Sequence, residues 1–234
     1  MKGICKKTIL QNFNSLTGYV FLGMYMAMAG AIFFTNNLLS LSSDLRVLFN
    51  SLTSVIVFLL PILTMGQFAE ERKQKTDELL LCSPISLTSI VLGKFFAVFI
   101  IFLMAVVITI IFPIILSFFA TISILEIVGC LVGFCLLGMS LIAIGLFISM
   151  LTDNPLVAAM CTYAIFALLS ISGNAVHMFQ SPILVTILNF VAITTHYTRF
   201  TYGVFALAPT IYYLSVTALF IFLCVYCLES RRLR

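Results

Sequence analysis

Charged side chains are scarce in this sequence, and one short stretch holds many of them. Residues 67–86 read QFAEERKQKTDELLLCSPIS and carry seven of the twenty formally charged residues. Thr76 can cap a short helix, and Asp77 and Glu78 would then lie in its first turn, where the helix dipole favours acids. Pro84 would end that helix. The pattern predicts a short, capped, mixed-charge helix, which is suited to docking another protein.

The same stretch has a simpler interpretation. Leu79, Leu80 and Leu81 would give the short helix an apolar side. A solvated loop whose charges lie at a membrane boundary would have a similar composition. The spacing alone leaves both interpretations open.

Other residue types that could do chemistry lack the partners that they need. Ser140 would require a histidine within hydrogen-bond reach to act as a nucleophile. The two histidines, His177 and His196, both fall in a segment near the end of the chain, and two histidines without a nearby acid or cysteine make a poor metal site. Cys224 and Cys227 form a CxxC within an apolar run, where cysteines are small buried hydrophobes. We therefore predict no catalytic residue and no metal site.

The sequence is consistent with an energy source outside this chain. The sequence has no GxxxxGK[ST] phosphate loop. Proton-coupled carriers usually hold ionisable residues in the middle of a span. Here Asp153 lies in a short polar turn and Glu126 lies near the boundary of an apolar run.

The elements that must position these residues are membrane spans. The chain has 234 residues, of which 62% are hydrophobic and 9% are charged, whereas soluble domains carry roughly 25% charged residues. We predict an all-α polytopic membrane protein, with one domain over residues 1–234 and six transmembrane helices. The predicted spans are residues 16–34, 52–68, 90–119, 124–151, 156–172 and 211–228.

The distribution of basic residues predicts the orientation of these spans. With six spans and a cytosolic N-terminus, ten of the twelve lysines and arginines fall on the cytosolic side, and Arg46 and Arg199 fall outside. Both termini would then be cytosolic. The apolar run at residues 183–193 is too short to cross, so we expect an extracellular, re-entrant or interfacial segment over residues 173–208.

Residues 1–15 are expected to form an amphipathic helix in the membrane interface. Its apolar face would carry Cys5, Ile9, Leu10, Phe13 and Leu16, and its polar face would carry Lys7, Thr8, Gln11, Asn14 and Ser15.

Several motifs resemble those of the type-2 ABC exporter permeases. The stretch between the second and third spans contains Glu70-Glu71-Arg72-Lys73, Thr76-Asp77-Glu78-Leu79-Leu80, Ser83-Pro84 and Gly93-Lys94. The end of the chain contains His196-Tyr197, Phe200, Gly203-Val204, Tyr212-Tyr213 and Glu229-Ser230-Arg231-Arg232. This second set resembles the branch that contains the gliding-motility and nitrous-oxide-reductase-maturation permeases.

The resemblance implies a bacterial inner-membrane permease whose cytosolic loop, residues 69–88, docks a separate ABC ATPase. Two permeases would meet within the lipid, the second being a copy of this chain or a homologous permease, and the ATPase dimer would bind ATP and Mg. No cofactor would bind this chain, and no nucleic acid would be a partner. The implied coupling residues are Glu70, Glu71, Arg72, Thr76, Asp77, Glu78, Leu79, Leu80 and Pro84, and Lys6 and Lys7 could reach the same ATPase.

Two other functions are compatible with the same spans. A non-transporting membrane anchor or assembly subunit would have the spans without a docking helix. A secondary carrier would have buried polar residues at mid-depth or inverted repeats.

Overall fold

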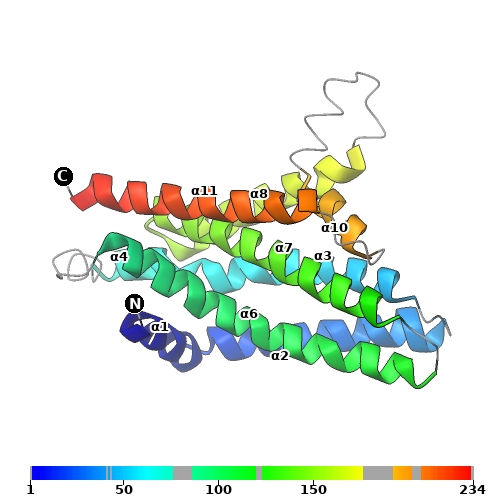
Figure 1. The fold of residues 1–234 in the computed structure, drawn as a ribbon. Coiled ribbons are helices and arrows are strands. Elements are labelled where there is room, and N and C mark those ends of the chain that lie inside the picture. Colours follow the sequence, from blue (N-terminus) through cyan, green and yellow to red (C-terminus); the bar gives the residue numbers. More distant parts are fainter. Residues whose placement is uncertain are drawn as a thin grey trace.

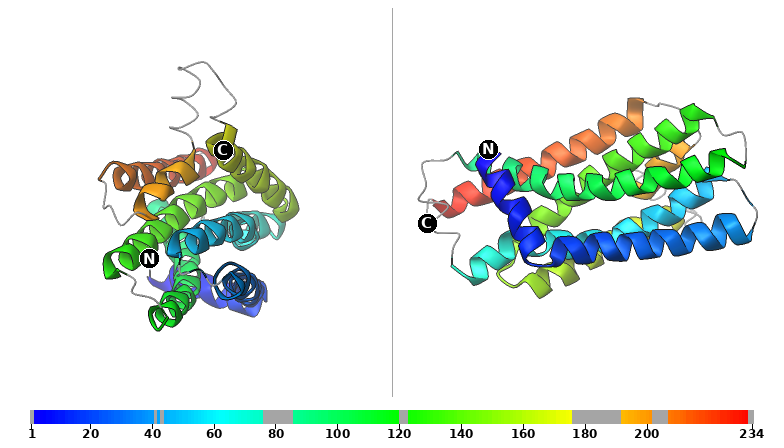
Figure 2. Two further views of the ribbon diagram at one scale, coloured as in Figure 1. Left: turned by 90° about the vertical axis from the view of Figure 1, so that its right-hand side faces the viewer. Right: turned by 90° about the horizontal axis from the view of Figure 1, so that it is seen from below.

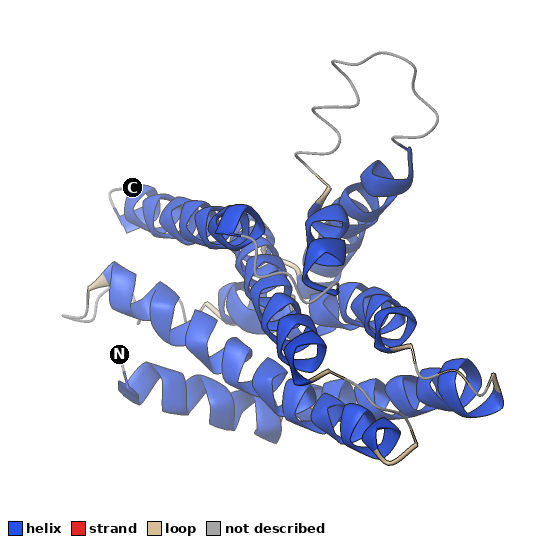
Figure 3. Ribbon diagram, turned by 45° about the vertical axis from the view of Figure 1, so that its right-hand side comes forward, coloured by secondary structure: helices blue, strands red, loops and turns tan. Residues whose placement is uncertain are grey.

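The computed structural model describes residues 2–40, 42, 44–75, 86–119, 123–175, 192–201 and 207–232, and every regular element in this part is a helix (Figures 1 and 3). In chain order they are α1 (Lys2–Asn14), α2 (Thr17–Phe33), the π-helical η1 (Phe34–Leu39), α3 (Leu45–Thr64), α4 (Gly66–Lys73), α6 (Leu87–Ser117), α7 (Ile124–Leu151), α8 (Pro155–Ala175), α10 (Ile193–Thr201) and α11 (Leu207–Arg232).

Six of these helical units account for the six predicted spans. Five are long and apolar enough to cross a membrane: α2 with η1, α3 with α4, α6, α7 and α11. The sixth predicted span falls on α8, which has 21 residues. Its apolar part, Pro155–Ser170, is shorter than the roughly 20 residues that usually cross a membrane. The all-helical, polytopic prediction is confirmed.

The helices extend beyond the apolar runs that predicted them. The second span was predicted to start at residue 52, yet α3 begins at Leu45 and its continuation α4 ends at Lys73. Leu48 and Phe49, which precede the predicted start, are fully buried. Helical hydrogen bonding continues wherever one face packs against a neighbour, so counting lipid-compatible residues gave a segment that was too short.

The bundle is organised around α7, which contacts α3, α4, α6, α8, α10 and α11 (Figure 2). Small residues allow this central position. A Cβ atom added to Gly145 would lie 2.4 Å from the hydroxyl oxygen of Thr64 on α3. Such close approach of backbones is how helices associate in lipid, where apolar burial gives no driving force.

Large apolar side chains cover the outside of the bundle. Met160 on α8, Leu207 and Phe222 on α11, and Ile114 on α6 are all exposed. Soluble monomers rarely expose contiguous apolar surface on this scale. These faces are therefore suited to contact with lipid or with another membrane helix.

One end of the bundle brings together α1, α4 and the C-terminal end of α11 (Figures 1 and 2). Helix α1 packs against α6. Thr8 and Asn12 of α1 are buried, whereas Leu10 is exposed. The buried polar residues have a polar neighbour on α4, described below.

Candidate functional site

The start of α4 is fixed by a serine on the central helix. Met65, between α3 and α4, keeps helical backbone angles (φ −57°, ψ −40°), but the pattern of helical hydrogen bonds is interrupted there. The Ser149 hydroxyl accepts hydrogen bonds from the backbone N–H groups of Phe68 (3.1 Å) and Ala69 (3.2 Å), and it donates to the carbonyl oxygen of Met65 (2.8 Å). Ser149 thus compensates for the break and attaches the first turn of α4 to α7.

A buried lysine joins α4 to α6. Lys94 on α6 is 2% exposed, and its ammonium group forms an ion pair with the Glu71 carboxylate. The same ammonium donates to the backbone carbonyl of Gln67 and lies 4.1 Å from the centre of the Phe68 ring. A carboxylate, a carbonyl dipole and an aromatic face all favour the cation at this position.

An arginine joins the end of α4 to the turn between α7 and α8. Arg72 Nη1 donates to Asp153 Oδ1 at 2.9 Å and to the carbonyl oxygen of Thr152 at 3.5 Å. The Arg72 side chain is 7% exposed, whereas the Asp153 side chain is 81% exposed. The polar turn predicted around Asp153 therefore lies beside α4, with its carboxylate largely in solvent.

An amide pair joins α4 to α1. Gln67 Nε2 donates to Asn12 Oδ1 at 2.9 Å and to the carbonyl oxygen of Leu63 at 3.0 Å. Asn12 Nδ2 donates in turn to the carbonyl oxygen of Thr8 at 3.1 Å. Because buried amides need partners, this pair accounts for the burial of Asn12 on α1.

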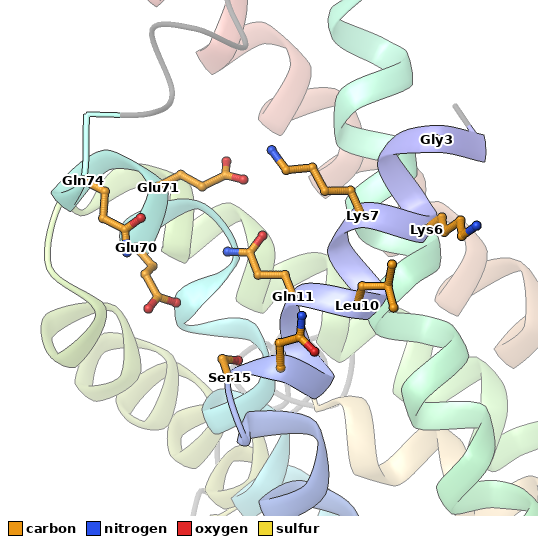
Figure 4. A pocket seen from close by; sticks show the side chains of 10 residues that line it. Gly3, Lys6, Lys7, Leu10, Gln11, Ser15, Glu70, Glu71 and Gln74 are labelled. Carbon is orange, nitrogen blue, oxygen red and sulfur yellow. The ribbon is translucent and has the colours of Figure 1, made fainter.

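An open groove of about 800 Å³ separates α1 from the end of α4. Glu70 and Glu71 belong to its α4 wall, and Lys6 and Lys7 belong to its α1 wall. In Figure 4, Lys7 extends toward the α4 wall and Lys6 points away from it. The remaining lining residues are Gly3, Leu10, Gln11, Asn14, Ser15 and Gln74.

The structure brings part of the predicted coupling set together. Glu70, Glu71, Arg72, Lys6 and Lys7 lie at one end of the bundle. Glu71 and Arg72 make ion pairs within the chain, and Glu70 and the two lysines line the groove. The predicted docking residues Thr76, Asp77, Glu78, Leu79, Leu80 and Pro84 lie outside the described residues, as does most of the 183–193 run.

Sequence reasoning missed how this site is held together. Lys94 appeared only as part of a motif, although a lysine eight residues into an apolar helix indicates a buried partner. Asn12, Gln67 and Ser149 gave no comparable signal, since each is polar but unremarkable in its own segment. Within the described part of the chain, no three histidine, cysteine, aspartate or glutamate side chains gather to hold a metal ion.

The comparison with known families identifies the kind of protein in which this site operates. A family model described as "ABC-2 family transporter protein" matches residues 4–229. The chain belongs to the ABC-2 transporter family. No curated protein matches it.

This ABC-2 chain is a multi-pass permease component of an ABC transporter, and such permeases work with an ABC ATPase. The charged end of the bundle offers no nucleophile–base pair among its described contacts. Its contacts fasten α4 to four neighbouring parts of the chain.

Proposed function

We propose that this ABC-2 permease is the translocation subunit of an exporter in the bacterial inner membrane. The α1–α4 end of the bundle faces the cytosol, and an ATPase subunit docks there through the segment at residues 69–88. Two permeases, either identical or homologous, meet in the lipid, and the two ATPase subunits bind ATP and Mg.

The observation that carries this proposal is the position of α4. Helix α4 leads directly into residues 76–85, and α6 begins at Leu87 directly after them. A protein that binds this segment therefore acts on two spans at once. The contacts of Lys94, Arg72, Gln67 and Ser149 connect α4 to the rest of the bundle, so movement there is passed on.

Charge supports the assignment of this end to the cytosol. The α1–α4 end also contains the start of α6 and the end of α11 (Figure 1). The described basic residues of these parts are Lys6, Lys7, Arg72, Lys73, Lys75, Lys94 and Arg231. Arg46 lies at the start of α3, at the other end. Cytosolic boundaries of membrane proteins carry an excess of lysine and arginine.

The test is co-expression with candidate ABC ATPases from the same genome, followed by purification in detergent. We expect the parent chain to recover an active ATPase. The variant Asp77→Ala/Leu80→Ala should lose most of that recovery, because it removes a charged and an apolar contact from the predicted docking helix without touching the Lys94 or Arg72 ion pairs.

A matched control removes the same residue types from the opposite end. Asp44→Ala/Leu39→Ala changes an exposed acid and an exposed leucine beside α3 and η1, and it should recover the ATPase as the parent does. If the folded parent recovers no ATPase, the exporter proposal fails and a non-transporting anchor becomes the better explanation. If both variants lose ATPase equally, docking is not at residues 69–88.

A further inference from the structure

We propose that Lys94 is a positioning residue that clamps α4 to α6, so that the two helices move as one body when the ATPase acts on the segment between them. The contact that opens in this movement is the one between Arg72 and Asp153. The inference rests on the proposed function, because it needs a docked ATPase as the source of movement.

The first step is the burial of the Lys94 ammonium group. Its described surroundings are the Glu71 carboxylate, the Gln67 carbonyl and the Phe68 ring, and all three belong to α4. Separating α4 from α6 would withdraw every one of these groups from a cation that is 2% exposed. Withdrawing a carboxylate, a carbonyl and an aromatic face from a buried cation is strongly unfavourable, so α4 and α6 are expected to stay together.

The second step is the contrast with the Arg72–Asp153 contact. Asp153 is 81% exposed, so water can replace Arg72 as its partner. Arg231 on α11 also lies near enough to repel Arg72 electrostatically. Only one partner of this pair is buried, Arg72 at 7% exposed, whereas both partners of the Lys94–Glu71 pair are buried, at 2% and 11% exposed. Of the two charged contacts of α4, the one with the α7–α8 turn is therefore the weaker.

The third step is where the movement enters. The predicted docking segment joins the end of α4 to the start of α6, so a force on it could spread the two helices apart. The Lys94 clamp lies between those helices, at Glu71 near the end of α4 and about two turns into α6. The Ser149 hydrogen bonds keep the first turn of α4 on α7, so with the clamp closed the force tilts the C-terminal end of α4 together with α6, away from the α7–α8 turn.

The test measures distances in the permease–ATPase complex in lipid nanodiscs, with the seven native cysteines replaced. Spin labels at Lys73→Cys on α4 and Thr88→Cys on α6 report on the clamp. Labels at Lys73→Cys and Leu156→Cys report on the contact between α4 and the start of α8. Each pair of labels is measured with and without ATP trapped by vanadate, and all three labelled positions are exposed.

In the parent complex we expect the 73–88 distance to stay constant and the 73–156 distance to shift when ATP is trapped. The double variant Glu71→Met/Lys94→Met replaces the ion pair by apolar side chains of similar length and removes both charges together, so it should fold. In this variant the 73–88 distance should shift or broaden with ATP. The single variant Lys94→Arg should retain the parental behaviour, because a guanidinium can donate to both the carboxylate and the carbonyl.

The outcomes separate this inference from the proposed function. A 73–88 distance that changes with ATP in the parent would overturn the clamp even if the ATPase binds and turns over. So would a Glu71→Met/Lys94→Met variant that keeps the parental pattern. If no ATPase binds the folded parent, the clamp falls together with the exporter proposal.

Discussion

The two ends of the bundle are held together by different chemistry. At the α4 end, a buried cation joins two helices through Glu71. At the opposite end, the Arg46–Glu126 pair between α3 and α7 is 3.6 Å apart, and its side chains are 45% and 36% exposed. There α10 is held by neutral groups instead, as the Tyr213 hydroxyl donates to the carbonyl oxygen of Ile193 at 2.7 Å.

This difference teaches where the molecule can rearrange. A buried ion pair cannot be stretched gradually, because either partner alone is strongly disfavoured in an apolar interior. Neutral hydroxyl–carbonyl bonds and close-packed surfaces can be exchanged at lower cost. The α4–α6 junction should therefore behave as a fixed unit, and the contacts around α10 should be easier to reorganise.

The largest effect is expected from Lys94→Ala. Removing the cation leaves the buried Glu71 carboxylate without its ion-pair partner on α6, at a cost of about 3–5 kcal/mol. Unfolding in detergent, followed by heating or by denaturant, measures the loss. Lys94→Arg is the control, and it should retain most of the stability. A loss below about 1 kcal/mol for Lys94→Ala, the range of exposed pairs, would break the contrast between the two ends.

A smaller effect is expected where α10 packs on α7. A Cβ atom added to Gly133 would lie 2.7 Å from Cβ of Phe200, so Gly133→Val should overpack this contact and cost about 1–3 kcal/mol. Gly23→Val is the matched control, since nothing lies within 4 Å of the position that its Cβ would take.

Pairing the glycine change with Phe200→Gly sharpens that prediction, because it removes both the ring and the Cβ atom that lies 2.7 Å from the added Cβ. If shape complementarity holds α10 in place, the smaller residue at position 200 should restore part of the stability lost by Gly133→Val. A double variant that is as unstable as the sum of its single changes would show that the two residues are not coupled.

An intermediate case is Ser149→Ala, which removes the neutral hydrogen bonds between α7 and the start of α4. Hydrogen bonds between membrane helices average about 0.6 kcal/mol and reach about 1.7 kcal/mol, so the loss should fall in that range. Ser140→Ala is the control, because the Ser140 hydroxyl donates only within α7 among the described contacts, to Leu137 at 2.8 Å. Equal losses for the two serines would mean that Ser149 does not support α4.

The sequence predicted the spans well because lipid contact imposes a simple rule. Runs of apolar residues near 20 in length must form helices that satisfy their own backbone groups. The same rule says nothing about helix ends, and so it missed the turns at Leu48 and Phe49, which are buried by neighbouring helices rather than by lipid.

The internal contacts of the site could not be predicted because they depend on residues far apart in the chain. The burial of Asn12 on α1 depends on its hydrogen bond with Gln67, which lies 55 positions later in the chain. The presence of Lys94 in an apolar helix indicates a carboxylate partner. The candidates were the four acids of the 67–86 stretch: Glu70, Glu71, Asp77 and Glu78. The helical spacing of α4 decides among them, since Gln67 and Glu71 lie four residues apart and so share one face.

The smallest effect is expected from Arg46→Ala at the end opposite α4. Both side chains of the Arg46–Glu126 pair are partly in solvent, and exposed pairs contribute about 0.2–1 kcal/mol. Salt screens such pairs, so the difference between parent and variant should shrink further at high ionic strength. The loss caused by Lys94→Ala should not respond to salt, because that ion pair is buried. Unfolding both variants at low and high salt therefore compares the two ends directly. A large, salt-independent loss for Arg46→Ala would show that buried charge also fastens the α10 end.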